Sequence, residues 1–151
     1  MKTTVIAAAA AIALGAFAGA ALAQAKPEVL VKQRQAAMTL IGKYFGPLGA
    51  MAQGKAPFNA QTVQRNADYL AALSQMPWDG FHASTAGEKS RAKPELFKET
   101  QKVNELAERL QSEVKQLQTL AKGGDEAAIK AQIGAVGKAC GACHDAYREK
   151  Q

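Results

Sequence analysis

The sequence contains only two cysteines and two histidines among its 151 residues. So few cysteines exclude a disulfide-dense scaffold and a metal site built from four cysteines. No run of Lys and Arg is dense enough for a nucleic-acid surface, although the formal charge is +6. The chain is also too short for a large multidomain enzyme, so we expect one domain with one modest core.

Charged and polar side chains are absent from residues 5–23, which follow a short positive start. This stretch is rich in Ala and ends on Ala-Leu-Ala, a pattern typical of secretory cleavage sites. We therefore expect residues 1–23 to be a cleaved signal peptide and residues 24–151 to form the exported domain in an oxidising compartment. An uncleaved membrane anchor is the alternative, because a stretch of this length could just span a bilayer.

The strict alternation typical of strands is missing after the expected signal, whereas apolar residues recur every three or four positions in four stretches. These stretches predict an all-α fold, and the short connections within the first and last pairs predict an antiparallel four-helix bundle. The first stretch opens at Pro27, and a kink is expected at Gly46-Pro47. The second begins after the N-cap residue Asn59 and ends before Pro77.

The third and fourth stretches carry the most regular apolar spacing. The third is expected to begin at Pro94 and to end at Gly123-Gly124, and the fourth to begin after the N-cap residue Asp125. Residues 77–93 form a connection too long for a tight turn, and long loops in compact domains are often functional. The expected inward faces comprise Leu30, Ala37, Met38, Ile41, Phe45, Leu48, then Val63, Ala67, Leu70, Leu73, then Leu96, Val103, Ala107, Leu110, Val114, Leu117, Ala121, and finally Ile129, Ile133, Val136, Cys140, Cys143 or His144, and Tyr147.

Both cysteines fall in one short motif, Cys140-Gly141-Ala142-Cys143-His144, the attachment pattern of a c-type haem. On a helix, cysteines three residues apart share a face, so both sulfurs can form thioethers to the vinyl groups of one porphyrin edge. The neutral imidazole of His144 projects from the same side and can ligate the iron as an axial ligand. One covalent haem c is therefore the predicted cofactor.

Two other functions of this motif have less support than haem attachment. A Cys-x-x-Cys redox pair usually follows a strand in a mixed fold, whereas this motif ends a helical chain. A zinc ion would need Cys140, Cys143, His144 and the distant His82 together, yet adjacent Cys143 and His144 could hardly ligate one tetrahedral ion. His82 lies in the polar connection, where a solvated side chain is the ordinary state.

A methionine could supply a second iron ligand. Met38 lies on the expected inward face of the first stretch, whereas Met51 and Met76 lie near helix ends. Met38 is therefore best placed to face the iron, although core filling is the usual role of an inward methionine.

A haem motif at the C-terminal end of a four-helix chain resembles the class II c-type cytochromes, and the chain is similar to the cytochrome c′ family over nearly all of residues 26–151. The matching segments are Lys26-Pro27-Glu28, Arg34-Gln35, Gly54-Lys55-Ala56-Pro57-Phe58, Pro77-Trp78 with Phe81, and Cys140-Gly141-Ala142-Cys143-His144-Asp145-Ala146-Tyr147-Arg148. The resemblance implies a periplasmic homodimer with one haem whose sixth iron position is open.

The resemblance also implies a role for each site residue. Cys140 and Cys143 would form the thioethers, His144 would be the axial ligand, Arg34 and Gln35 would contact the haem propionates, Met38, Trp78 and Phe81 would form the distal pocket, and Arg148 would flank the proximal face. An apolar distal pocket offers no hydrogen bond to bound dioxygen, so nitric oxide and carbon monoxide are the expected ligands.

Two functions thus remain open for the haem. The first is gas binding with an unligated Met38, accompanied or replaced by single-electron transfer with an unidentified redox partner. The second is electron transfer alone, because low-spin relatives in class II use a methionine at this place as the sixth ligand. No nucleophile and base pair accompanies the motif, so we expect no enzyme activity. The lack of a dense Lys and Arg run, together with export, predicts no nucleic-acid partner. Cleavage of the signal peptide would leave no membrane-embedded segment.

Overall fold

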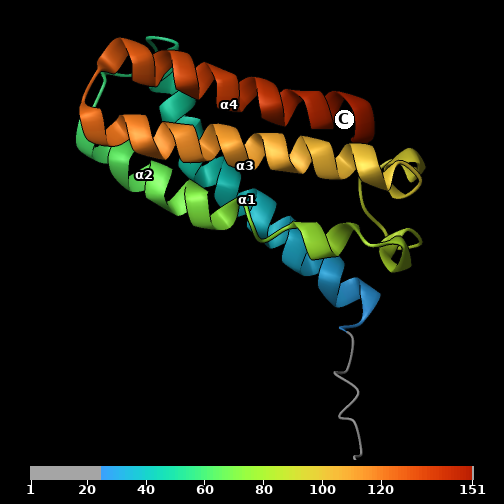
Figure 1. Ribbon diagram of the computed structural model, residues 1–151. Coiled ribbons are helices and arrows are strands. Elements are labelled where there is room, and N and C mark those ends of the chain that lie inside the picture. The colour runs from blue at the N-terminus through green and yellow to red at the C-terminus, as the bar shows by residue number, and fades with distance from the viewer. Residues whose placement is uncertain (1–24, 151) are drawn as a thin grey trace, which may run out of the picture.

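The computed structural model describes residues 25–150, so the expected signal peptide, residues 1–23, lies outside the described residues. Within them the chain forms four α-helices (Figure 1), namely α1 (Pro27–Ala52), α2 (Ala60–Leu73), α3 (Thr100–Gly123) and α4 (Glu126–Tyr147). Three short 3₁₀ helices connect α2 to α3, namely η1 (Trp78–Phe81), η2 (Ala83–Thr85) and η3 (Pro94–Phe97). These residues contain no strand beyond a single antiparallel bridge between Ala92 and Arg148.

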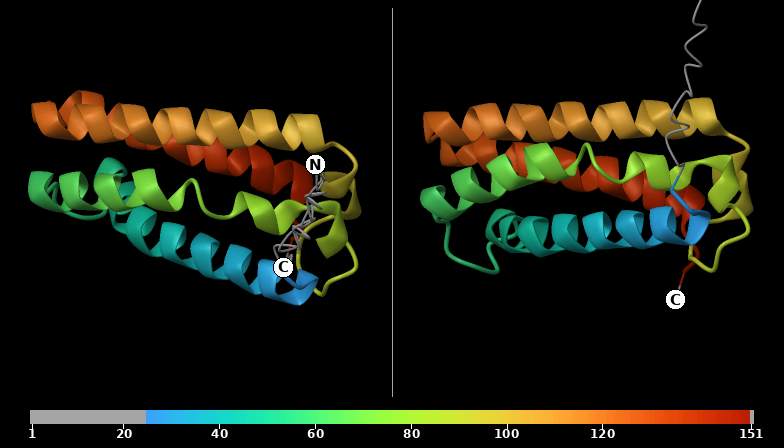
Figure 2. Two further views of the ribbon diagram at one scale, coloured as in Figure 1. Left: turned by 60° about the horizontal axis from the view of Figure 1, so that its bottom comes forward. Right: turned by 90° about the horizontal axis from the view of Figure 1, so that it is seen from below.

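The four helices run side by side as a bundle. Figures 1 and 2 show the start of α1, the end of α4 and the 3₁₀ helices together at one end, with the α1–α2 and α3–α4 connections at the other. Helix α3 packs against α2 and α4, and α1 packs against α2, α4 and η1. The prediction of an all-α four-helix bundle is confirmed, and the 3₁₀ segment lies at the end that carries the Cys-x-x-Cys-His motif.

The predicted N-caps begin α2 and α4. The Asn59 side chain accepts a hydrogen bond from the Thr62 amide at 2.7 Å, and the Asp125 side chain accepts one from the Ala128 amide at 3.1 Å. Each bond satisfies an amide that the first helical turn leaves without a partner. Helix α3 ends where Gly124 adopts a left-handed conformation with φ of 77°, which glycine adopts without steric cost.

Helix α1 includes Pro47 and ends at Ala52, and the kink expected at Gly46-Pro47 stays a prediction. One expected boundary differs from the structure. Helix α3 begins at Thr100 rather than Pro94, because Pro94 opens the separate turn η3. That turn places Leu96, only 3% exposed, against Val103 and Tyr147. Burial of Leu96 at the end of α4 thus decides the local path of the chain.

The buried apolar residues form two separate clusters. The larger, which we call the main core, comprises Leu48, Met51, Val63, Ala67, Leu70, Leu110, Val114, Leu117, Ala121, Ile129, Ile133, Val136 and Ala139. The smaller, which we call the end cluster, comprises Leu96, Val103 and Tyr147, with Phe81, Ala92, Phe97, Leu106 and Cys143 packed against it. A small domain usually has one contiguous core with smaller satellites, and the end cluster is such a satellite, built from the α2–α3 connection, α3 and α4.

The helices between residues 25 and 150 are all too short or too polar to cross a membrane.

Candidate functional site

A cavity of about 500 Å³ lies where the two clusters meet, and we call it the site cavity. All the site residues expected from the sequence line it, namely Arg34, Gln35, Met38, Trp78, Phe81, Cys140, Cys143, His144 and Arg148. Both clusters contribute to its wall, since Leu110 and Ala139 belong to the main core and Leu96 and Tyr147 to the end cluster. The fold therefore brings these residues from α1, η1 and α4 to one place.

The two cysteines share one face of α4, lie half-buried beside the cavity and form no disulfide with each other. Burial raises the pKa of both the Cys140 and the Cys143 thiol. A redox-active Cys-x-x-Cys pair needs a thiol whose pKa is lowered, so this environment does not favour dithiol chemistry. It does place two sulfurs along one side of the site cavity.

His144 follows Cys143 on α4 and also lines the cavity. Partial burial lowers its pKa, and the positive charges of Arg148 and Arg91 lower it further, against an opposing effect of Asp145. The neutral imidazole is thereby favoured, and this is the form that ligates iron.

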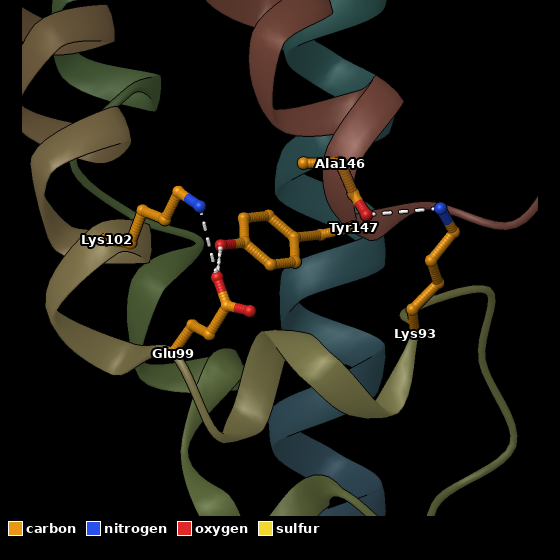
Figure 3. A network of polar contacts seen from close by, with 5 residues as sticks. All are labelled: Lys93, Glu99, Lys102, Ala146 and Tyr147. Carbon is orange, nitrogen blue, oxygen red and sulfur yellow. Dashed lines mark hydrogen bonds and ion pairs between the residues drawn. The ribbon is translucent and has the colours of Figure 1, made fainter.

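The last turn of α4 is held by polar contacts, most of which Figure 3 shows. The Lys93 ammonium donates to the Ala146 carbonyl at 3.1 Å and to the Asp145 carbonyl at 3.4 Å. The Tyr147 hydroxyl donates to the Glu99 carboxylate at 2.6 Å, and Lys102 contacts the same carboxylate. A lysine at a helix C-terminus satisfies free carbonyls and suits the helix dipole, so the turn that carries His144 is fixed from two sides.

Residues 90–93, which we call the strap, cross the C-terminal end of α4. The Lys93 amide donates to the Tyr147 carbonyl at 2.9 Å, and the Glu149 amide donates to the Arg91 carbonyl at 2.8 Å. The Arg91 guanidinium also donates to the Glu149 carbonyl, at 2.7 Å from Nη2. Sequence reasoning missed Ser90, Arg91 and Ala92 as cavity residues, because nothing local in the chain signals their pairing with residues 147–149.

Arg34 is buried, with only 5% of its surface exposed. Its guanidinium donates to the Gly80 carbonyl and lies 4.7 Å from the centroid of the Phe81 ring. Burial lowers its pKa, and no carboxylate of residues 25–150 pairs with it. The neighbouring Gln35 is exposed but also lines the cavity.

Apolar side chains line the α1 and η1 side of the site cavity. Met38 is half-buried on α1, and Trp78 and Phe81 lie with ring centroids 5.9 Å apart on η1. The Trp78 indole donates its N–H to the Ser74 carbonyl at 2.7 Å. Further apolar lining comes from Ile41, Phe45, Leu96, Leu106, Leu110 and Ala139.

The other candidate ligands lie elsewhere. Met51 is buried in the main core, and Met76 is 58% exposed. His82 is exposed and its Nδ1 lies 2.9 Å from the Ser84 hydroxyl, outside the site cavity. No three Cys, His, Asp or Glu residues of the described chain cluster as a metal ion would require. The arrangement needed for zinc is therefore not formed.

These observations fit a large, mostly apolar group that carries acidic substituents. Protein interiors contain few voids larger than a water molecule, yet this one separates the two clusters. A buried cation without a paired anion is costly, and a carboxylate on the group would compensate Arg34. Cys140, Cys143 and His144 would supply the two covalent attachment points and the iron ligand that haem c requires.

Comparison with known proteins agrees with this fit. A family profile described as Cytochrome C′ matches residues 29–148. A cytochrome c′ of Alcaligenes xylosoxydans xylosoxydans is 37% identical over 84% of this chain and 98% of its own length. One of Rubrivivax gelatinosus is 39% identical over 83% of this chain and 98% of its own length.

Solved structures agree as well. Cytochrome c prime from Shewanella frigidimarina superposes with a TM-score of 0.80 at 33% identity, covering 84% of this chain and 99% of that one. A ferrous variant of the Alcaligenes xylosoxidans protein with bound nitric oxide has a TM-score of 0.77 at 36% identity, covering 85% and 99%. A variant of the same protein with bound carbon monoxide has a TM-score of 0.76 at 37% identity, covering 83% and 98%. The chain belongs to the cytochrome c′ family, four-helix bundles that carry covalently attached haem c.

Proposed function

We propose that the protein binds small neutral gases, nitric oxide and carbon monoxide, at a haem iron with one protein ligand, and that it can also transfer single electrons. One observation carries this proposal: the site cavity has the haem motif on its α4 side and mostly apolar side chains on its α1 and η1 side. The relatives with bound nitric oxide and carbon monoxide support it. When bound, the haem supplies an iron that coordinates a diatomic gas and exchanges single electrons.

In this proposal Cys140 and Cys143 hold the haem by thioethers, and His144 is the axial ligand. Arg34 and Gln35 meet the propionates, because the buried Arg34 guanidinium has donors that its one contact to Gly80 does not use. The contacts of Lys93 and Tyr147 keep the last turn of α4 in place.

The wall opposite His144 in this proposal decides which ligands bind well. Met38, Trp78 and Phe81 present a thioether and two aromatic rings, and the Trp78 N–H is already bonded to Ser74. A ligand beside them gains no hydrogen bond, which disfavours dioxygen relative to nitric oxide and carbon monoxide. Arg148 lies one turn beyond His144 and provides positive charge on the proximal side.

A second candidate function is electron transfer alone, with the Met38 sulfur as sixth ligand. It is favoured by the position of Met38, the one methionine among residues 25–150 that lines the site cavity. A thioether ligand raises the reduction potential and blocks gas binding.

Optical and electron paramagnetic resonance spectra of the haem-loaded protein separate the two functions. We expect high-spin spectra that change when nitric oxide or carbon monoxide is added, and a Met38→Leu variant with the same spin state. A low-spin wild type that becomes high-spin in Met38→Leu would instead establish ligation by methionine. Met51→Leu is the matched control, because Met51 is buried in the main core.

The same resemblance supports a proposal for the cellular location and the assembly of the protein. We propose that the mature protein is a periplasmic homodimer without turnover chemistry, and that it takes part in electron transfer with a partner still to be identified. Cell fractionation and sedimentation of the mature protein test location and assembly.

A further inference from the structure

A second hollow, which we call the outer cavity, lies beside the site cavity and has a volume of about 600 Å³. Its lining comes from the N-terminal parts of α1 and α3, from η1 and η3, and from the first residues after η1. The lining residues are Leu30, Trp78, Asp79, Phe81, His82, Ala83, Leu96, Thr100, Val103 and Asn104. Nothing in the proposed function uses this space.

The two cavities share a wall. Trp78, Phe81 and Leu96 line both of them. Trp78 and Phe81 are three residues apart in η1, and side chains at this spacing in a 3₁₀ helix lie on the same side. Their rings, with centroids 5.9 Å apart, therefore form a partition one side chain thick.

This wall is held to α1 at Gly80. The Gly80 carbonyl accepts a hydrogen bond from the Arg34 guanidinium. The buried Thr85 hydroxyl shares its proton between the Gly80 carbonyl at 3.0 Å and the His82 carbonyl at 2.8 Å, so it ties both ends of this turn together. A Cβ atom at Gly80 would lie 2.5 Å from the Arg34 Cβ and 2.8 Å from the Leu30 carbonyl oxygen. The close approach requires glycine, and we call the Arg34–Gly80–Thr85 contact the clamp.

The remaining walls of the site cavity are stiffer. They come from α1, α3 and α4, whose backbones are hydrogen-bonded along their length, and from the strap, which is bonded to residues 147–149. The wall at η1 is a single turn in a connection of short turns. Short 3₁₀ segments have weaker hydrogen-bond geometry than α-helices, so this wall is the one that can open with least disruption.

We propose that the outer cavity is the entry chamber for neutral diatomic ligands, and that the Trp78–Phe81 wall, set by the clamp, is the gate through which they pass into the site cavity. This inference rests on the proposed gas binding. It predicts that the rate of ligand entry depends on residues that do not line the site cavity. Thr85, Ala83 and Asn104 are such residues, since none of them lines the site cavity.

The entry route is tested by filling the outer cavity in the haem-loaded ferrous protein. Asn104→Trp on α3 and Ala83→Trp on η2 each place a large ring at the outer cavity, and both native side chains are exposed. We expect carbon monoxide association, measured by flash photolysis, to slow by about threefold or more, with the absorption spectrum unchanged. Glu108→Trp, on the exposed surface of α3 and away from both cavities, is the control and should keep the wild-type rate.

The gate is tested at Thr85. Thr85→Val removes the hydroxyl at nearly constant volume, whereas Thr85→Ser keeps it. We expect Thr85→Val to raise the carbon monoxide association rate by about fivefold, the factor that corresponds to loss of one ordinary hydrogen bond. Hydrogen exchange of the Gly80, His82 and Thr85 amides, which reports on the wall without any gas, should also accelerate in Thr85→Val and return in Thr85→Ser.

Each measurement has a result that would overturn one part of the proposal. Wild-type association rates in both tryptophan variants would overturn the entry route, and faster amide exchange in Thr85→Val without faster association would overturn the gate. A wild type that binds no carbon monoxide would overturn the proposed gas binding itself, which is a different result from binding at an unchanged rate.

Discussion

The Tyr147 hydroxyl donates a hydrogen bond of 2.6 Å to the Glu99 carboxylate, and so joins the last turn of α4 to the start of α3 (Figure 3). This bond, together with burial, raises the pKa of Tyr147 to about 12. Hydrogen bonds from Tyr147 and Lys102 lower the pKa of Glu99 from its ordinary value of 4.5. The two groups therefore stabilise the fold only while Tyr147 keeps its proton and Glu99 has lost its own.

Removal of the hydroxyl in Tyr147→Phe should lower the thermal unfolding midpoint between about pH 5 and pH 9. The lowered pKa of Glu99 contributes stability above 4.5 that is lost as the pH falls through its folded-state value. The raised pKa of Tyr147 contributes stability below 10.0 that is lost as the pH rises towards about 12. Wild type and variant should therefore converge at both ends of the pH range.

Calorimetry or circular dichroism of the haem-loaded protein across this range measures the effect. Tyr69→Phe is the control, because Tyr69 is 45% exposed and its hydroxyl makes no hydrogen bond to residues 25–150. A Tyr147→Phe deficit that stays constant from acid to alkaline pH would contradict this assignment.

Lys93 and Lys102 offer a matched pair of lysines beside the same turn. Lys93→Met should lower the free energy of unfolding by about 0.5–1 kcal/mol, because its ammonium caps free carbonyls at the C-terminus of α4. Lys102→Met should change little, since its 3.4 Å ion pair with Glu99 is exposed on both sides. Urea unfolding at low and high salt compares the two, and equal losses would rule out the capping role.

The periodic parts of this fold could be predicted from the sequence, because burial of apolar stripes depends on local spacing. Val103, Leu110 and Leu117 lie seven residues apart, and all three are buried in α3 as their spacing predicts. The haem motif could also be recognised from the sequence, because Cys140, Cys143 and His144 lie within five consecutive residues. All the site residues expected from the sequence line the cavity, although their contacts to a haem remain predictions.

Contacts between distant segments could not be read in this way. Arg91 lies in a polar connection, and its bonds to Glu149 join residues far apart in the chain. The predicted start of α3 at Pro94 is wrong for a related reason, because Leu96 packs against Tyr147 in the end cluster. Arg34 fits its expected place at the cavity, but its contact with Gly80 depends on how η1 folds back onto α1.

Glycine at position 80 is required by space rather than by backbone conformation. Gly80→Ala should destabilise the protein by about 1–3 kcal/mol, since the added methyl group would meet the Arg34 Cβ at 2.5 Å and a backbone oxygen at 2.8 Å. Gly134→Ala is the matched control, because nothing lies within 4 Å of its Cβ position in the exposed face of α4. That variant should be more stable than wild type by about 0.5–1 kcal/mol. Denaturant unfolding of both variants checks the contrast, and equal shifts would refute it.

Attachment of the cofactor should depend on both cysteines of α4. Cys140→Ala and Cys143→Ala should each retain haem through one remaining thioether, and the double variant should lose all covalent haem. Mass spectrometry after denaturation measures the attached haem directly, and the haemochrome absorption distinguishes one thioether from two. Ala142→Ser, a change between the cysteines at an exposed position, should leave attachment complete.

The double variant also tests what fills the space between the two clusters. Without a retained haem, the cavity of about 500 Å³ lies between the main core and the end cluster. The amides of Tyr147 and Leu96 should therefore be the first to lose protection against hydrogen exchange. We therefore expect amide exchange to rise in η3 and the last turn of α4 while the main core, with Leu117 and Ile133, stays protected. Uniform loss of protection along all four helices would instead mean that the bundle folds only as one unit with its cofactor.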